Sequence, residues 1–364
     1  MAEKNSLKIG FTCANTPLPI IEAAGFSPHR ILPMGDCPDL SGQHLHDNLC
    51  PHVKKSLDAA LSGDMPDIAG MCFMNSCDAM RRMADAWRAL RPDDPLLLLD
   101  LPTTTDSRSI SFFADELRRM AKALAKWSGA PFDESAVKTC ASRFNTLCGV
   151  MKSVSEKYRS RRLEGGAARI QELRNMASTQ STIKSLAALE EIDCQPLSDP
   201  PEYDSADPDA PVPVFLFGNA MPDPKAFELF ESCGIHIVGD DLCTGSRMFQ
   251  PISLEPETEE DETGDIYLTL ARGIMRRPPC ARTFSAQNPG AIADDILSGA
   301  KACGARAVMG HILKFCDPYL DRLPMIRNRM KEQSVPLLLL EGDCTLRSVG
   351  QQGTRIEAFV EMLR

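Results

Sequence analysis

The sequence predicts an α/β protein with two doubly wound parallel sheets related by internal duplication, and a helical region inserted between them. Short apolar segments alternate with amphipathic ones near both ends of the chain, as expected for the strands and helices of parallel sheets. Residues 108–191 have almost purely helical spacing. The segment 335–341 (VPLLLLE) echoes 94–100 (DPLLLLD), which indicates a repeat.

Residues 1–107 are predicted to form the first lobe, in which strands and helices alternate. Gly25 closes the first helix, and the second helix has Pro51 in its first turn and Gly63 near its end. The predicted strands are 7–12, 30–34, 67–73 and 95–101, and the predicted helices are 17–25, 50–61 and 79–90. Such alternation favours parallel strands joined by helical crossovers.

A helical region is predicted at 108–193, followed by a linker at 194–213 that is rich in Pro, Asp and Ser. Lys and Arg are frequent in 152–174, and we interpret this stretch as a solvated basic face. A docking site for an acidic partner is the less favoured alternative.

The second lobe is predicted at 214–364. Asp317 is expected to cap a helix that has Pro318 in its first turn. The other predicted elements are strands at 213–218, 235–239, 307–313 and 336–341 and a closing helix at 354–363.

Two Cys-Asp pairs strengthen the case for a repeat. Cys77-Asp78 and Cys316-Asp317 each lie between an apolar strand and a helix, and each precedes its leucine run by a similar interval. Two such units packed face to face would bring together the carboxyl ends of both sheets, where open α/β sheets bind ligands. The walls of this common cleft would carry thiols.

Composition argues against several classes of protein. The net charge of −10 disfavours general binding of nucleic acids or anionic membranes. No apolar run approaches the roughly 20 residues that span a bilayer. The first residues lack the apolar core of a signal peptide, so we expect a cytoplasmic protein. In that compartment the 14 cysteines are not expected to form disulfides.

The cysteines are the residues that indicate chemistry. The chain has no CxxC motif, which disfavours zinc ribbons, dithiol redox sites and compact ferredoxin motifs. Scattered thiolates that converge in a cleft can hold an iron–sulfur cluster or a soft metal. Six cysteines near the ends of predicted elements are the candidate ligands: Cys13, Cys50, Cys77, Cys243, Cys280 and Cys316.

For any one of these cysteines taken alone, a buried structural thiol is the more common role. The remaining cysteines are interpreted as structural: Cys37, Cys72, Cys140, Cys148, Cys194, Cys233, Cys303 and Cys344. The chain has no GxGxxG after a strand, no GxxxxGK(S/T) and no GxSxG motif. If ATP or nicotinamide electrons enter the chemistry, another protein therefore supplies them.

Several short motifs make the chain resemble the benzoyl-CoA reductase/2-hydroxyacyl-CoA dehydratase family, and its D- or B-type subunits in particular. The resemblance covers nearly the whole chain, and the order and spacing of the motifs make it specific. They are CANTP (13–17) followed by EAAG (22–25), NLCPHVKKS (48–56), CDAMRRM (77–83), DLCTG (241–245), CDPY (316–319) and GQQGTR (350–355).

The resemblance implies two flavodoxin- or Rossmann-like lobes and an oxygen-sensitive iron–sulfur cluster. Dehydratase and reductase subunits of the family hold a [4Fe–4S] cluster on three cysteines, which match Cys50, Cys77 and Cys316. A branch of the family has a double-cubane cluster on six cysteines. The second set matches Cys13, Cys243 and Cys280. Because all six positions are filled, the cysteine pattern resembles the double-cubane branch most closely.

The same resemblance implies the partners. Family members receive single electrons from a separate ATP-hydrolysing activator that carries its own cluster. The chain would form a homodimer that reduces a small molecule, or it would pair with a related subunit and act on a CoA thioester. A non-catalytic electron-transfer or cluster carrier protein is the third alternative. Neither a nucleic acid nor a membrane is expected as a partner.

Two details bear on the substrate. The family's usual Pro-x-Glu after the first motif is Pro17-Leu18-Pro19 here, so a standard substrate assignment does not transfer. Local basic residues could still contact CoA, although a solvated helix face is their more common role; the candidates are Lys54, Lys55, Arg81 and Arg82.

Overall fold

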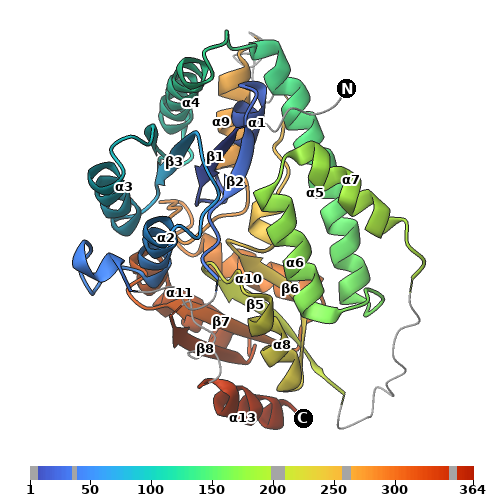
Figure 1. The fold of residues 1–364 in the computed structure, drawn as a ribbon. Helices are drawn as coiled ribbons and strands as arrows, with labels where there is room; N and C mark the ends of the chain where they lie inside the picture. Colours follow the sequence, from blue (N-terminus) through green and yellow to red (C-terminus); the bar gives the residue numbers. More distant parts are fainter. Residues whose placement is uncertain (1–6, 35–38, 198–209, 256–263, 344–350) are drawn as a thin grey trace.

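The computed structural model describes residues 7–34, 39–197, 210–255, 264–343 and 351–364. Cys37, Cys344, most of the predicted linker and Gly350 of the closing motif lie outside these ranges. Figure 1 shows two sheets in separate parts of the molecule, with helices around both. All described strand pairs are parallel, so the predicted α/β fold with two parallel sheets is confirmed.

The first sheet has four strands in the order β2-β1-β3-β4. Its helix α2 begins at a proline, whose missing N–H is not needed there, and ends at Gly63 with a left-handed φ of 81°. Trp87 of α3 is fully buried and packs edge-on against Phe73 of β3, which holds the helix on the sheet. The elements are β1 (Lys8–Phe11), α1 (Leu18–Ala23), β2 (Ser27–Arg30), α2 (Pro51–Ser62), β3 (Gly70–Asn75), α3 (Asp78–Leu90) and β4 (Leu96–Asp100).

The second sheet also has four strands, in the order β6-β5-β7-β8. Every residue of β7 is buried, as expected for a central parallel strand. A Cβ at Gly218, where β5 ends, would lie 2.1 Å from the backbone oxygen of His311, so a larger residue does not fit. The elements are β5 (Val212–Gly218), α8 (Pro224–Ser232), β6 (Ile235–Leu242), the short 3₁₀ helix η2 (Ser246–Phe249), α9 (Ile266–Met275), α10 (Ala291–Ala302), β7 (Ala307–Leu313), α11 (Asp317–Glu332), β8 (Leu337–Gly342) and α13 (Gly353–Leu363).

The two sheets share one strand order, as an internal repeat predicts. In each sheet the chain adds strands first on one side of the starting strand and then on the other. The direction changes between β1 and β3 in the first sheet and between β5 and β7 in the second. Ligands of open α/β sheets bind at such switch points, outside the carboxyl ends of the strands. Cys13 and Cys77 follow β1 and β3, while Asn219 and Cys316 follow β5 and β7.

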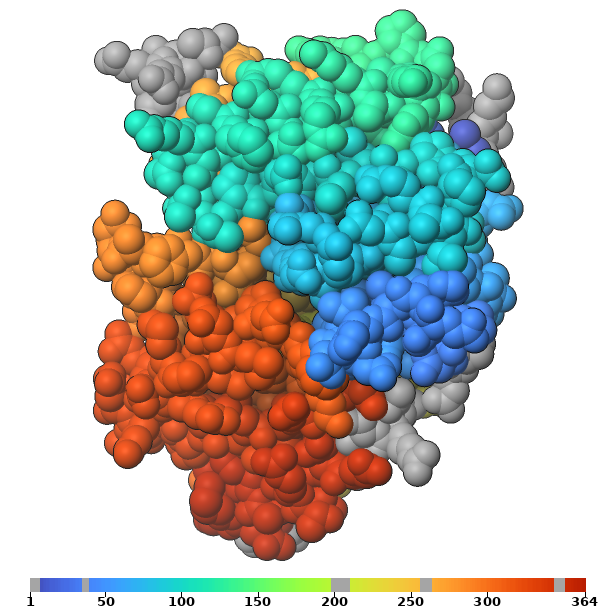
Figure 2. All heavy atoms as spheres, turned by 90° about the vertical axis from the view of Figure 1, so that its left-hand side faces the viewer, coloured from blue at the N-terminus to red at the C-terminus, as the bar shows by residue number. Residues whose placement is uncertain are grey.

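Four helices fill the region between the lobes in the sequence: α4 (Ser107–Ser128), α5 (Glu134–Arg159), α6 (Gly166–Thr179) and α7 (Thr182–Asp193). They pack against both lobes, since α4 contacts β4 and α9, and α5 contacts α1 and β6. Phe11, Leu147 and Leu216 from the three regions belong to one continuous apolar core. Figure 2 shows the first lobe in blue and cyan lying directly against the orange and red second lobe.

Some local predictions were wrong. The strand predicted at 30–34 is β2 at Ser27–Arg30, because this edge strand pairs with β1 and an edge position tolerates Pro28. The strand predicted to end at residue 239 continues to Leu242, since arginine side chains bind the two carboxylates that make 240–241 look like a loop.

Two further details differ from prediction. Cys316, rather than Asp317, is the N-cap residue of α11. Arg174, assigned to the solvated basic face, is buried and forms an ion pair with Asp240 at 2.7 Å. None of the helices in the described ranges combines the length and apolar character that a membrane span requires.

Candidate functional site

Three of the predicted ligands lie at the N-termini of helices. Cys50 is the N-cap residue of α2, Cys77 of α3 and Cys316 of α11. The first backbone N–H groups of a helix have no partner within the helix and carry partial positive charge, which stabilises a nearby anion. We call Cys50, Cys77 and Cys316 the helix-cap triad.

The other three predicted ligands lie on loops. Cys13 follows β1, Cys243 comes directly after β6, and Cys280 lies between α9 and α10. We call Cys13, Cys243 and Cys280 the loop triad. Because these residues are not at helix N-caps, the helix dipole does not act on them as it does on the helix-cap triad.

All six predicted cysteines line one cavity between the lobes, with a volume of about 130 Å³. This volume is well below the roughly 300–1,000 Å³ of typical sites for organic ligands. The cavity therefore suits a compact group surrounded by sulfur better than a whole CoA thioester. All the cysteines that the structure describes are free thiols.

Cysteines of the same triad oppose each other's ionisation. Negative charge on Cys280 and Cys243 opposes ionisation of Cys13, and Cys280 acts in the same way on Cys243. Cys316 is affected by Cys77 and also by Cys243. Cys316 therefore lies where the two triads meet.

Burial dominates the ionisation of these thiols. It raises the pKa of both Cys13 and Cys316 to about 11, so each is neutral near pH 7. Catalytic nucleophilic cysteines have lowered pKa values instead. The metal ions of a bound cluster would supply the positive charge that allows buried thiols to ionise. The site therefore fits a ligand set better than a set of nucleophiles.

Three buried nitrogen atoms on the cavity lining have no hydrogen-bond partner among the described residues: Arg30 Nε, His52 Nδ1 and Arg247 Nη1. Among the described residues that line the cavity, none is a carboxylate. An unpaired buried polar group is costly, and an anionic group in the cavity would accept from arginine donors. The lining therefore fits an iron–sulfur cluster held by thiolates, which is negatively charged.

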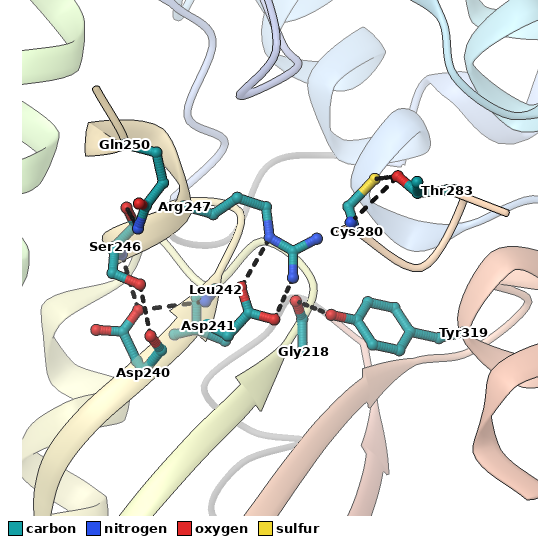
Figure 3. Close-up of polar contacts among 10 residues, drawn as sticks. All are labelled: Gly218, Asp240, Asp241, Leu242, Ser246, Arg247, Gln250, Cys280, Thr283 and Tyr319. Carbon is teal, nitrogen blue, oxygen red and sulfur yellow. Dashed lines mark hydrogen bonds and ion pairs between the residues drawn. The ribbon is translucent and has the colours of Figure 1, made fainter. Parts of the chain in front are cut away.

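Each buried arginine is held in place by the fold. Arg30, at the end of β2, donates to the backbone oxygens of Cys243 at 2.6 Å and Thr12 at 3.1 Å. Arg247 donates through Nε to Asp241 at 2.9 Å and makes a second contact with that carboxylate. Figure 3 shows the Arg247 guanidinium between Asp241 and Cys280.

Asn219 is a site residue that the sequence analysis missed. Its Nδ2 donates to Cys316 Sγ at 2.9 Å, and its Oδ1 accepts from the Leu313 N–H at 2.9 Å. The available signal was its position, because it follows β5 as Cys13 follows the matching strand β1. Asn219 therefore orients a predicted ligand from the opposite side of the switch point.

The Cys280 loop is anchored to both lobes. Arg282 donates to the backbone oxygens of Ser76 at 3.1 Å, Pro102 at 2.7 Å and Leu101. From α11, Arg322 donates to the oxygen of Ala281 at 3.1 Å. These bonds fix the position of Cys280 although it lies outside a helix or strand.

The remaining cysteines that the structure describes do not line this cavity: Cys72, Cys140, Cys148, Cys194, Cys233 and Cys303. Cys72, Cys140, Cys148 and Cys233 are buried, which agrees with a structural role, whereas Cys194 is exposed. Within the described ranges, no three His, Cys, Asp or Glu side chains converge as a site for a single metal ion. The thiols are therefore spread around a cavity and are not arranged as the ligands of a single metal ion.

The candidate CoA contacts lie on helix faces and do not line the cavity. Lys54 pairs with Asp47 at 3.6 Å, and Arg82 pairs with Asp85 at 3.1 Å. Arg81 donates to Asn75 Oδ1. These contacts agree with ordinary solvated helix faces.

The fold and site together define a two-lobed α/β protein with a thiol-lined cavity at the switch points of both sheets. The family described as "2-hydroxyglutaryl-CoA dehydratase, D-component" matches residues 13–363, so the chain belongs to that family. The match includes all six predicted ligands.

The curated relatives have low sequence identity to this chain, and they match it over most of their length and of its own. The beta subunit of (R)-phenyllactyl-CoA dehydratase from Clostridium sporogenes is 21% identical over 100% of this chain and 93% of its own length. The beta subunit of lactoyl-CoA dehydratase from Anaerotignum propionicum has the same identity and coverage. The C-type subunit of benzoyl-CoA reductase from Thauera aromatica is 21% identical over 93% of this chain and 86% of its own length.

Proposed function

We propose that this chain is the cluster-bearing component of an enzyme that carries out low-potential, one-electron reductive chemistry, with a double-cubane iron–sulfur cluster held by both triads. The convergence of all six predicted cysteines on one small cavity carries this proposal. The names of the relatives, which are dehydratase and reductase subunits, support an enzymatic role.

The protein residues would have distinct roles around the cluster. The helix-cap triad and the loop triad would supply the sulfur ligands, and Arg30 and Arg247 would offset their negative charge. Asn219 would hold Cys316 in position. The cluster itself would supply single electrons, and iron–sulfur clusters can reach the low potentials that this chemistry requires.

The electrons would come from a separate ATP-hydrolysing activator protein, because the chain lacks nucleotide-binding motifs of its own. With the double-cubane cluster, the chain would form a homodimer that reduces a small molecule, as the resemblance to that branch of the family implies. A cytoplasmic location, where thiols stay reduced, suits the free cysteines.

A second candidate is a subunit of a 2-hydroxyacyl-CoA dehydratase or aryl-CoA reductase. In this case the helix-cap triad alone would hold a single [4Fe–4S] cluster, and a related subunit would complete the enzyme. The relatives favour it, since they are subunits of enzymes named for CoA thioesters. A cluster carrier without its own substrate is the third candidate.

Iron and acid-labile sulfide counts on anaerobically purified protein separate the first two candidates. We expect about eight irons per chain for the six-cysteine cluster and about four for the single cluster. Cys280→Ala should reduce the higher count. Unchanged iron in this variant would rule out the double-cubane proposal.

Turnover assays separate the enzymes from the carrier. The activator-reduced protein is assayed with acetylene, hydrazine and a 2-hydroxyacyl-CoA. Turnover of acetylene or hydrazine supports the first candidate, and turnover of the thioester supports the second. A reduced cluster that transforms none of them would favour the carrier.

A further inference from the structure

A second cavity of about 300 Å³ lies between the helical region and the second lobe. It shares no lining residue with the thiol cavity. Its walls come from one face of α5, from α6 and from the end of β6. Figure 3 shows that Asp240, which lines this cavity, lies beside Ser246, while the neighbouring Asp241 contacts Arg247.

Much of the lining is apolar and aromatic. The helical region and the second lobe both contribute buried apolar side chains: Met151, Ile170, Phe215, Phe227, Ile237 and Phe249. The volume is at the lower end of the roughly 300–1,000 Å³ typical of sites for small organic ligands. This part of the cavity suits the hydrocarbon portion of a small molecule.

The charged residues of the lining are mainly cationic. Lys152 and Arg159 are exposed on the α5 face, and Lys152 has no ion-pair partner in the described part of the chain. Asp240 is the one carboxylate among the described lining residues. It already accepts from the N–H groups of Leu242 and Ser246 and pairs with Arg174.

Arg174 provides an independent indication of a ligand. Its side chain is 6% exposed, and its Nε has no hydrogen-bond partner among the described residues. A buried donor without an acceptor is unfavourable, and a carboxylate is a strong acceptor for a guanidinium. With Asp240 engaged, the cavity retains an excess of positive charge.

We propose that this cavity binds a small organic carboxylate with an apolar body. The carboxylate interacts with Arg174, Lys152 and Arg159, and the apolar body packs against the aromatic lining. This site is additional to the proposed cluster function and does not depend on it, because the two cavities have separate linings.

Gly149 permits a sharp test. It lines the cavity from within α5, and a Cβ built there meets no atom within 4 Å. Gly149→Leu therefore has space for its Cβ and should occupy part of the cavity, and it replaces glycine by a better helix former. Gly149→Ala has the same effect on the backbone and adds little volume, so it is the matched control.

Binding of hexanoate and phenylacetate to the anaerobically purified protein is measured by ligand-observed NMR and calorimetry. The neutral probes are hexan-1-ol and benzyl alcohol, and hexyl phosphate tests a different anion. We expect the carboxylates to bind at least tenfold more tightly than the neutral probes. Gly149→Leu should abolish binding, Gly149→Ala should retain it, and Lys152→Glu should weaken it about tenfold.

Several results would overturn the proposal. Neutral probes that bind as tightly as the carboxylates would remove the role of the cations, and tighter binding of hexyl phosphate would assign the site to phosphate esters. Unchanged carboxylate affinity in Gly149→Leu, with circular dichroism like that of the wild type, would place any binding elsewhere. The cluster content is measured in parallel and should be the same in all three variants.

Discussion

The helix-cap triad and the loop triad line the same cavity, but the fold holds and neutralises them in different ways. Cys50, Cys77 and Cys316 each begin a helix, so backbone N–H groups place partial positive charge beside them. Cys13 and Cys243 lie near the guanidinium of Arg30, and Arg247 also acts on Cys243. The helix-cap triad therefore depends on backbone geometry, whereas in the loop triad two arginine side chains add to a backbone hydrogen bond from Asn15 to Cys13.

This difference shows that two lobes with the same strand order can contribute differently to a shared site. Cys77 and Cys316 occupy matching positions after β3 and β7. At the other matching pair of strand ends, the first lobe has Cys13 and the second has Asn219, which donates to Cys316. The position that holds a sulfur in the first lobe thus holds a hydrogen-bond donor in the second.

The largest effect is expected from Cys316→Ser. Cys316 interacts with both triads and accepts from Asn219, so its loss should remove nearly all iron and sulfide, whereas Cys280→Ala removes part. Iron and sulfide are counted after anaerobic reconstitution. The exposed Cys194→Ser is the control and should keep the wild-type content. If Cys316→Ser and Cys280→Ala lost equal amounts, the distinction between the triads would fail.

An intermediate effect is expected from Arg30→Met, which removes a charge from the loop triad without leaving a carboxylate unpaired. Positive charge stabilises the reduced, more negative state of a cluster, so the reduction potential should become more negative by on the order of 100 mV. Potentiometric titration followed by EPR measures this shift. The exposed Lys138→Met should leave the potential unchanged. A shift of the opposite sign would contradict the role given to Arg30.

The smallest effect concerns His311 on β7, the strand that leads to Cys316. Burial lowers the pKa of His311 to about 4, partly offset by Asp343, and neither ring nitrogen has a partner among the described residues. The unfolded state therefore binds an extra proton between about pH 6.5 and pH 4, and stability falls as the pH falls through this range.

Urea unfolding of the cluster-free protein at several pH values measures this dependence. The histidine should contribute a slope of about 1.4 kcal/mol per pH unit. His311→Leu should remove that contribution, while the exposed His44→Leu should keep the wild-type slope. Equal slopes in the two variants would show that the fold does not lower the pKa of His311.

The sequence predicted the sheets and the six candidate ligands because both leave local signals. A central strand such as β7 is an uninterrupted apolar run, and each candidate cysteine lies near the end of an element. It did not predict Arg30, His52 or Arg247 as part of the site. Sequence alone gives no sign that a charged residue is buried, and most charged residues are exposed, so these three are recognised only from the packing.

Long-range pairing explains the other misses. Arg174 was assigned to a solvated face because its partner Asp240 lies in another part of the chain. The same pairing lets β6 continue through residues that resemble a loop. The position of Asn219 after its strand was visible in the sequence, but its contact with Cys316 depends on β5 and β7 being neighbours in the sheet.

The anchored Cys280 loop and the late position of Cys316 set the order in which the protein can mature. The thiol cavity needs both sheets, so it cannot form on the ribosome until β7 and α11 have been made. At roughly 5–20 residues per second, Cys13 is synthesised about 15–60 s before Cys316. During that interval the thiols are not yet buried in the folded cavity, so they are more accessible to oxidants. Loading of the proposed cluster would therefore follow synthesis of α11, and a chain that stops before β7 would present its thiols with no cavity to hold them.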